Sequence, residues 1–125
     1  DWFKGKLYDK ILVDAPCSAS GIIRRQVDIK YLRQEQDLPA ICNEQTNILT
    51  SVATLLKPKG QLLYATCSVF AEENSQLIAK FLKSNSDFRE MKLKYKFAQN
   101  CEHGVQILPS EFNMDGFYYC LLRKI

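Results

Sequence analysis

The stretch Ile11-Leu12-Val13-Asp14-Ala15-Pro16-Cys17-Ser18 decides how this chain is expected to fold. It begins with a short apolar run, which is typical of a strand buried on both faces. The run stops at Asp14, and Pro16 then removes a backbone donor, so the chain must leave the sheet in a tight loop that ends at Gly21. Ligands of open α/β sheets bind just outside the carboxyl ends of the strands. Asp14 and Cys17 are therefore expected at the functional end of the sheet.

A second strand with the same kind of ending follows later in the chain. Residues 61–66 form another apolar run, and Cys67 comes directly after it. Between the two runs, Asp37 is a good helix N-cap, Pro39 suits the first turn, and apolar residues recur at helical spacing as far as Leu56. Strand, helix and strand in this order give a right-handed crossover and a parallel pair. Two neighbouring strands would thus end in two thiols.

The rest of the chain continues the α/β pattern. Glu72, Glu73 and Asn74 open a further helix, where the acids suit its positive N-terminal end. Residues 88–93 are a weak strand candidate, residues 97–115 read as a long irregular segment, and residues 116–123 form a convincing last strand. We predict an α/β fold with a mostly parallel sheet and a C-terminal antiparallel strand.

The composition is that of an ordinary globular protein. The chain has 125 residues, of which 46% are hydrophobic and 25% are charged, so it is one domain or part of one. A formal net charge of +3 permits an anionic partner without requiring one. Five widely spaced cysteines, with no signal peptide before them, indicate free thiols in a reducing cytoplasm. The apolar runs are much shorter than the roughly 20 residues of a membrane helix, so we expect no membrane partner.

The chain reaches its first strand almost at once. Residues 1–6 contain no initiator methionine and lead directly into the strand predicted at residues 8–13. A buried parallel strand needs neighbours on both sides, so we expect that earlier strands are missing and that the chain is the second half of a larger domain. The unpaired apolar edge should then be covered by self-association or by a rearranged terminus.

A basic stretch follows Gly21 and includes Arg24, Arg25 and Lys30. Sequence alone favours a solvated loop and a short helix here. A functional interpretation stays open beside it. Arginine pairs well with phosphate, so the stretch could form a phosphate-contacting rim next to the loop of Asp14 and Cys17.

Three familiar kinds of cysteine chemistry fit the sequence poorly. Zinc sites want several closely spaced ligands, and only Cys101 and His103 lie close together, so we predict no metal site. In cysteine phosphatases five residues separate the thiol from the arginine, whereas six separate Cys17 from Arg24, and Pro16 stands where the histidine should be. A cysteine protease needs a histidine base, and a single histidine in a loop is more often merely exposed.

A thiolate that adds to an electron-poor ring is the remaining option. C5 of cytosine takes a methyl group only after a thiolate has added to C6 and made C5 nucleophilic. Such a site needs a nucleophilic cysteine, an acid that binds the base edge, and help with proton removal. Cys67, Asp14 and Cys17 could fill these roles. The plainer alternative is that both thiols are small residues in tight turns. Two thiols at two strand ends favour the catalytic interpretation.

Several stretches resemble the motifs of one enzyme family. Residues 14–21, Asp-Ala-Pro-Cys-Ser-Ala-Ser-Gly, resemble the fourth motif of RNA (cytosine-5) methyltransferases, and residues 64–68, Tyr-Ala-Thr-Cys-Ser, resemble their sixth. Residues 24–25, 28–30, 72–74 and 115–118 also match. The set is similar to the bacterial Sun/Fmu (RsmB-type) branch, which methylates small-subunit ribosomal RNA. Val27 and Tyr31 replace a usual proline and a usual tryptophan, and neither position touches the chemistry.

The resemblance implies a role for each motif residue. Cys67 would be the nucleophile, Cys17 would assist release of the methylated RNA, and Asp14 would contact the target base. Asp14, Ala15 and Pro16 would also border the cofactor, S-adenosylmethionine.

The resemblance further implies that Arg24, Arg25 and Lys30 contact the ribosomal RNA. It implies a Rossmann-like methyltransferase fold, of which residues 1–125 would be the C-terminal half, from the fourth motif onward. The glycine-rich loop and the acids that hold S-adenosylmethionine in this family are not in the chain. We therefore expect a partial catalytic domain that is inactive by itself. The alternative is a non-catalytic RNA-binding or assembly module that retains the motifs as turn residues.

Overall fold

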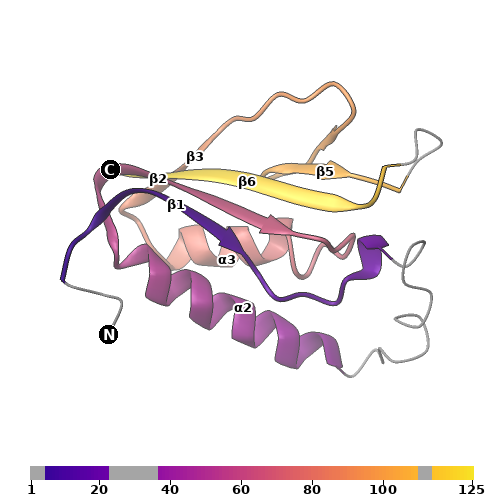
Figure 1. The fold of residues 1–125 in the computed structure, drawn as a ribbon, viewed down its shortest axis with the longest axis horizontal. Coiled ribbons are helices and arrows are strands. Elements are labelled where there is room, and N and C mark those ends of the chain that lie inside the picture. The colour runs from indigo at the N-terminus through magenta and orange to yellow at the C-terminus, as the bar shows by residue number, and fades with distance from the viewer. Residues whose placement is uncertain (1–4, 23–36, 110–113) are drawn as a thin grey trace.

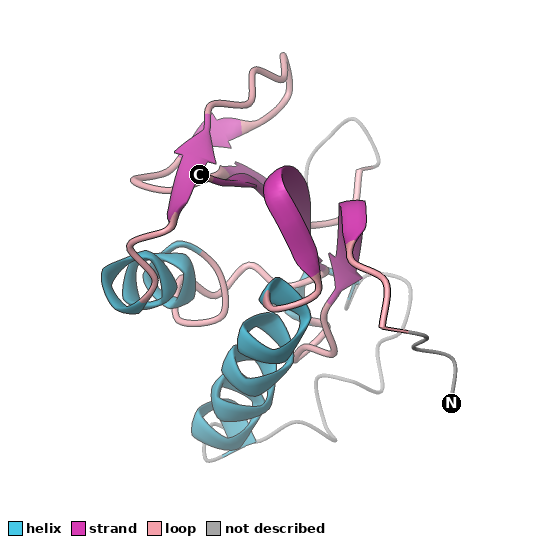
Figure 2. Ribbon diagram, turned by 90° about the vertical axis from the view of Figure 1, so that its left-hand side faces the viewer, coloured by secondary structure: helices cyan, strands magenta, loops and turns pink. Residues whose placement is uncertain are grey.

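The computed structural model describes residues 5–22, 37–109 and 114–125 of the chain. In these residues one six-stranded mixed sheet carries two α-helices on the same face (Figure 1). Figure 2 shows the two helices next to each other beneath the sheet. The elements are β1 (Tyr8–Asp14), the 3-10 turn η1 (Ser20–Ile22), α2 (Leu38–Ala53), β2 (Leu56–Thr66), α3 (Ser75–Ser84), β3 (Phe88–Met91), β4 (Gln99–Asn100), β5 (Val105–Ile107) and β6 (Phe117–Lys124).

The predicted crossover is present as β1, α2 and β2. The two strands pair in parallel, with Asp14 opposite Ala65, and their carboxyl ends reach the same end of the sheet (Figure 1). Asp37 occupies the N-cap position of α2, as expected. β2 begins at Leu56, earlier than the predicted residue 61, because the pairing continues through an irregularity in the register. Lys59, with a φ of 67°, lies in this irregular part.

The C-terminal part of the sheet is antiparallel. The order is β1-β2-β6-β5-β4, with β3 also paired to β6. β6 runs antiparallel to β2, which confirms the predicted last strand. β3 and β5 are antiparallel to β6, and β4 to β5, so antiparallel pairings are more numerous in the described residues than the sequence suggested. The segment predicted as irregular contains β4 and β5, whose two and three residues are too few to show a periodicity.

The core lies between the sheet and the two helices. Tyr64 and Leu122 on the sheet, Leu49 on α2 and Ile78 on α3 are all completely buried. Full burial of one such aliphatic side chain stabilises the fold by about 1.5–3 kcal/mol. This core fixes the parallel pair, and thereby the two loops that follow it. Among the residues described, neither helix has the length and apolar character needed to cross a membrane.

β1 lies at the edge of the sheet and is buried on only one face. Val13, on the side of the helices, is 5% exposed, whereas Leu12 on the other side is 66% exposed. The prediction of a strand buried on both faces is therefore wrong for this chain. The physical reason is that β2 is the one strand paired with β1 in the described residues, and no helix covers Leu12.

Candidate active site

The two loops that follow β1 and β2 bring two thiols together. The sulfur atoms of Cys17 and Cys67 lie 3.0 Å apart, although the two residues are 50 positions apart in the sequence. The cause is the parallel register, because Asp14 and Ala65 are partners and each cysteine follows within a few residues. Both thiols are partly buried. The predicted meeting of Cys17 and Cys67 is thus found in the structure, with Asp14 at the end of the same strand.

The Cys67 thiol is held in its protonated form. Burial, the hydrogen bond with Cys17 and the nearby negative charge of Asp14 together raise the pKa of Cys67 to about 12. Each of these influences disfavours the thiolate. At neutral pH the Cys67 side chain would therefore be a protonated, weakly nucleophilic thiol. It becomes a strong nucleophile only when a bound partner removes its proton or compensates the charge.

Backbone hydrogen bonds fix the Cys17 loop against the neighbouring chain. The N–H of Ala15 donates to the carbonyl of Ala65 at 2.9 Å, and the N–H of Gly21 donates to the carbonyl of Cys67 at 2.8 Å. The N–H of Gly116 in turn donates to the carbonyl of Gly21 at 2.7 Å. A Cβ atom on Gly21 would lie only 2.1 Å from the carbonyl oxygen of Gly116. Glycine is required here because the two backbones are in direct contact.

The buried side chain of Glu73 joins the two thiol loops. One oxygen, Oε1, accepts hydrogen bonds from the N–H of Ser18 at 2.7 Å and from Nε2 of Gln45 at 3.1 Å. The other oxygen, Oε2, accepts from the hydroxyl of Ser18 at 2.7 Å and from the hydroxyl of Ser68. From the sequence, Glu73 was explained by its place at the positive start of a helix. The preceding residue, Glu72, fits that explanation equally well. No local signal distinguishes the two, so this contact was missed.

A second polar network holds the Cys67 loop against the start of α3. The hydroxyl of Thr66 donates to Oδ1 of Asn74 at 2.6 Å, and Nδ2 of Asn74 donates to the carbonyl of Ser68 at 2.9 Å. Nε2 of Gln106 on β5 donates to the same carbonyl at 3.1 Å. Thr66, Ser68, Asn74 and Gln106 are all buried. Because these hydrogen bonds lie in a poorly solvated region, they make the loop rigid.

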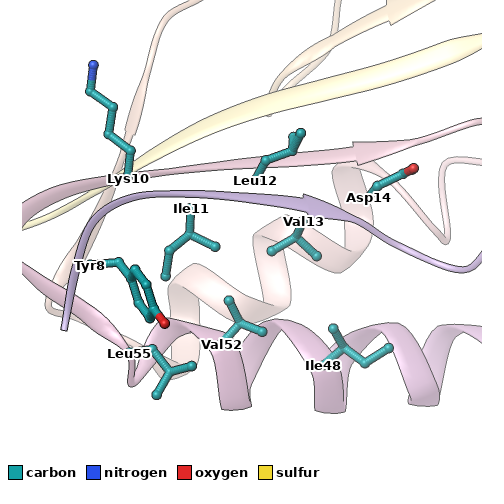
Figure 3. A pocket seen from close by; sticks show the side chains of 9 residues that line it. All are labelled: Tyr8, Lys10, Ile11, Leu12, Val13, Asp14, Ile48, Val52 and Leu55. Atoms are coloured by element: carbon teal, nitrogen blue, oxygen red, sulfur yellow. The ribbon is translucent and has the colours of Figure 1, made fainter. Parts of the chain in front are cut away.

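The residues predicted to border the cofactor differ in their accessibility. Asp14 and Pro16 are exposed, whereas Ala15 is buried and its N–H is already used in the sheet. Asp14 also lies at one end of an apolar groove of about 470 Å³ between β1 and α2 (Figure 3). Of these three residues, Asp14 and Pro16 therefore have accessible side chains. Ala15 can contribute only its position in the loop.

The remaining predicted site residues are placed as follows. Arg24, Arg25 and Lys30, expected to contact RNA, lie outside the described residues. His103 is not merely exposed, because its Nδ1 lies 2.8 Å from a carboxyl oxygen of Glu90. In residues 5–22, 37–109 and 114–125, no three His, Cys, Asp or Glu side chains group as metal ligands.

Comparison with known protein families gives a match over nearly the whole chain. Residues 1–123 match the family described as 16S rRNA methyltransferase RsmB/F. The chain is 50% identical over 118 residues to ribosomal RNA small subunit methyltransferase B of Pasteurella multocida, covering 94% of this chain and 26% of that protein. It is 46% identical to the protein of the same name from Shewanella oneidensis, covering 98% and 28%. The chain thus spans little more than a quarter of these relatives.

Solved structures show the same fold. The crystal structure of PH0851 superposes with a TM-score of 0.87 at 37% identity, over 93% of this chain and 26% of that one. NSun6 from Pyrococcus horikoshii, solved with SFG, superposes with a TM-score of 0.82 over 96% of this chain and 31% of that one. At 24% identity the second likeness shows the fold alone. Together with the family match, these structures confirm the predicted α/β fold of Rossmann-like methyltransferases.

Proposed function

The chain belongs to the 16S rRNA methyltransferase RsmB/F family, and from this premise we propose that it carries the catalytic cysteines of an RNA (cytosine-5) methyltransferase. The reaction would transfer a methyl group from S-adenosylmethionine to C5 of a cytidine in small-subunit ribosomal RNA. The observation that supports this most strongly is the pair of thiols of Cys17 and Cys67, 3.0 Å apart beside Asp14. A single nucleophilic cysteine would not require a second thiol at this distance.

In the proposed reaction Cys67 forms a temporary bond to the base. Its thiol first loses its proton, since the neutral form, with a pKa of about 12, is a poor nucleophile. The sulfur then adds to C6 of cytosine, and the electron pair of the C5–C6 double bond moves toward C5 and the ring. C5 is now the electron-rich atom that receives the methyl group. Loss of the C5 proton restores the double bond and expels the Cys67 thiolate.

Asp14 would act during this addition, and Cys17 would act in the later elimination. Asp14, which is exposed at the end of β1, would hydrogen-bond the edge of the base and stabilise the ring when it takes up the electron pair. Cys17, in contact with Cys67, would assist the final elimination that frees the RNA. Reaching C6 requires the cytidine to leave its stack, as in other enzymes that act on a nucleobase. Arg24, Arg25 and Lys30 are proposed to contact the RNA backbone.

S-adenosylmethionine, when bound, supplies the methyl group. From this chain Asp14 and Pro16 would line one side of its site, with Ala15 holding the loop between them. The five glycines of the sequence are scattered singly, and none forms the glycine-rich turn that holds this cofactor in the family. We therefore infer that this chain by itself transfers no methyl group. All five cysteines are free, which is consistent with the cytoplasmic location that we propose.

The experiment that tests the proposal replaces each cysteine by alanine in a full-length protein that contains this chain. Cys67→Ala should abolish turnover and the covalent adduct together, because Cys67 is the thiol that is proposed to add to C6. Cys17→Ala should still form the adduct but fail to resolve it, so a protein–RNA complex should persist on denaturing gels. Cys42→Ala, at a partly buried thiol outside this pair, is the matched control and should behave as wild type. Trapping by Cys67→Ala, or by neither variant, contradicts the assignment.

A non-catalytic RNA-binding or assembly module is the second candidate, and one assay separates it from the enzyme. RNA that contains 5-fluorocytidine cannot lose a proton from C5, so it traps the bond between C6 and the attacking thiol. The enzyme should form this adduct in a manner that depends on Cys67. A binding module should retain the RNA without any covalent product.

The open edge of β1 supports a further proposal about the chain alone, namely that two copies pair through it. The N–H of Ala15 points toward β2, so by alternation the backbone groups of Lys10, Leu12 and Asp14 face the open edge. Figure 3 shows Lys10 and Leu12 on the opposite side of β1 from α2. If a two-fold axis passes through Leu12, the strands pair antiparallel and Lys10 of one copy lies opposite Asp14 of the other. This complementary charge selects a second copy as the occupant of the edge.

A further inference from the structure

We propose that Glu73 is a positioning residue that sets the distance between the two thiols. Its side chain is completely buried, with 0% exposure, and accepts four hydrogen bonds. The donors come from three separate segments, which are the Cys17 loop, α2 and the Cys67 loop. None of the four donors carries a charge. Burying a carboxyl group without an ionic partner costs free energy unless hydrogen bonds satisfy its oxygens. The four hydrogen bonds of Glu73 meet this requirement.

The chain geometry explains how Glu73 acts on the sulfurs. Cys17 directly precedes Ser18, and Cys67 directly precedes Ser68. Ser18 and Ser68 share Oε2 of Glu73 as a common acceptor, so the carboxyl group links the two dipeptides on one side while the sulfurs meet at 3.0 Å. Loss of the shared acceptor removes this link at the residue next to each thiol, while the backbone hydrogen bonds of Ala15 and Gly21 remain. The distance between the two sulfurs should then become variable.

The two oxygens of Glu73 differ in a way that makes the idea testable. The donors at Oε1 are two nitrogen atoms, the backbone N–H of Ser18 and Nε2 of Gln45, and each of these nitrogens can only donate. The donors at Oε2 are the hydroxyls of Ser18 and Ser68, which can rotate and accept a hydrogen bond instead. Glutamine can therefore place its carbonyl oxygen at the Oε1 position and its amide group against the hydroxyls. Glu73→Gln should keep the link, whereas Glu73→Ala removes it.

The experiment measures how readily Cys17 and Cys67 form a disulfide in the purified protein. Glutathione disulfide is the oxidant: the two thiols give up two protons and two electrons, one sulfur–sulfur bond forms, and two molecules of glutathione are released. The equilibrium at graded ratios of reduced to oxidised glutathione gives the effective concentration of one thiol at the other. Mass spectrometry of the linked peptides identifies the pair. Neither RNA nor S-adenosylmethionine is used, so the result is independent of the proposed reaction.

Glu73→Ala should lower this effective concentration at least tenfold, and Glu73→Gln should stay within about threefold of wild type. Glu72→Ala is the matched control, because Glu72 is exposed at the same helix start, and it should change nothing. Leu77→Ala in α3 controls for stability alone, since it truncates a buried apolar side chain that takes no part in these hydrogen bonds. An equal loss in Glu73→Ala and Leu77→Ala, or no loss in Glu73→Ala, overturns the proposal.

The catalytic consequence rests on the proposed function and has its own measurement. In a full-length methyltransferase that contains this chain, Glu73→Ala should lower kcat at least tenfold while KM for the RNA stays within about twofold. Glu73→Gln should restore most of kcat. If the disulfide measurement succeeds but Cys67 forms no adduct with RNA, the positioning role stands and the proposed reaction fails. A rise in KM without a fall in kcat would show that Glu73 shapes the RNA site instead.

Discussion

Replacing Gly21 by alanine tests whether the thiol loops are held together by direct backbone contact. The added Cβ atom would lie 2.1 Å from the carbonyl oxygen of Gly116, 2.6 Å from its carbonyl carbon and 2.8 Å from the carbonyl oxygen of Cys67. Non-bonded atoms normally approach to about 3.5 Å, so the backbone must move by about 1 Å. These neighbours are main-chain atoms and cannot rotate away. Gly21 must therefore separate from Cys67, from Gly116 or from both.

The energetic cost follows from these contacts. Overpacking of a closely packed site costs about 1–3 kcal/mol. The hydrogen bonds from Gly21 to Cys67 and from Gly116 to Gly21 would weaken at the same time, each contributing about 0.5–1.5 kcal/mol. We therefore expect Gly21→Ala to lower the free energy of unfolding by about 3 kcal/mol. The φ of Gly21 is not in the left-handed region, so no dihedral strain adds to this cost.

Urea unfolding followed by circular dichroism measures this loss. Gly5→Ala is the matched control: a Cβ on Gly5 meets no atom within 4 Å, and only its φ of +72° disfavours alanine, at a cost of about 1–2 kcal/mol. Gly21→Ala should therefore be the more damaging of the two. If it unfolds within about 0.5 kcal/mol of wild type, the contact between the loops is not close-packed and the reasoning fails.

Two further predictions concern alkaline pH and the edge of the sheet. Burial raises the pKa of Cys120 to about 12 from a usual 9.0, so above pH 9 the unfolded chain loses this proton while the folded chain keeps it. Cys120 alone should then lower stability by about 1.4 kcal/mol per pH unit between pH 9 and 12, and Cys67 adds a fall of the same sign. Cys120→Ala should therefore make the total fall shallower when urea midpoints are compared across this range. Leu12→Lys should turn the pairing of two β1 edges into a contact of like charges, so light scattering should report a dimer for the wild-type chain and a monomer for the variant. A wild-type chain that stays monomeric at high concentration would contradict the edge pairing, with Leu108→Lys at another exposed leucine as the control.

The sequence was sufficient for the elements that carry a clear pattern. β1, α2, α3 and β6 were predicted because apolar periodicity and capping residues identify long elements. The meeting of Cys17 and Cys67 was predicted because the carboxyl ends of neighbouring parallel strands share one edge of the sheet. These inferences depend only on local pattern and on topology.

Other features depend on tertiary contacts that no local pattern encodes. β4 and β5 are too short to have a periodicity, and they form because β5 pairs with β6 and β4 pairs with β5. The role of Glu73 was missed because a helix start already accounts for an acid there. Leu12 was predicted to be buried, since an apolar run does not reveal which side of a strand is covered. In each case the answer lies in what packs against the residue.

The contact between Cys17 and Cys67 also has a consequence for how the chain folds. The two thiols are 50 positions apart in the sequence, so they meet only after β1, α2 and β2 have assembled. Closing a loop of this length costs conformational entropy before the contacts between the strands can stabilise it. The meeting of the thiols is therefore expected late in the folding of the chain. A ribosome-bound chain that ends before β2 would have Cys17 without its partner. Cross-linking of the thiol pair would therefore report that β1, α2 and β2 have come together.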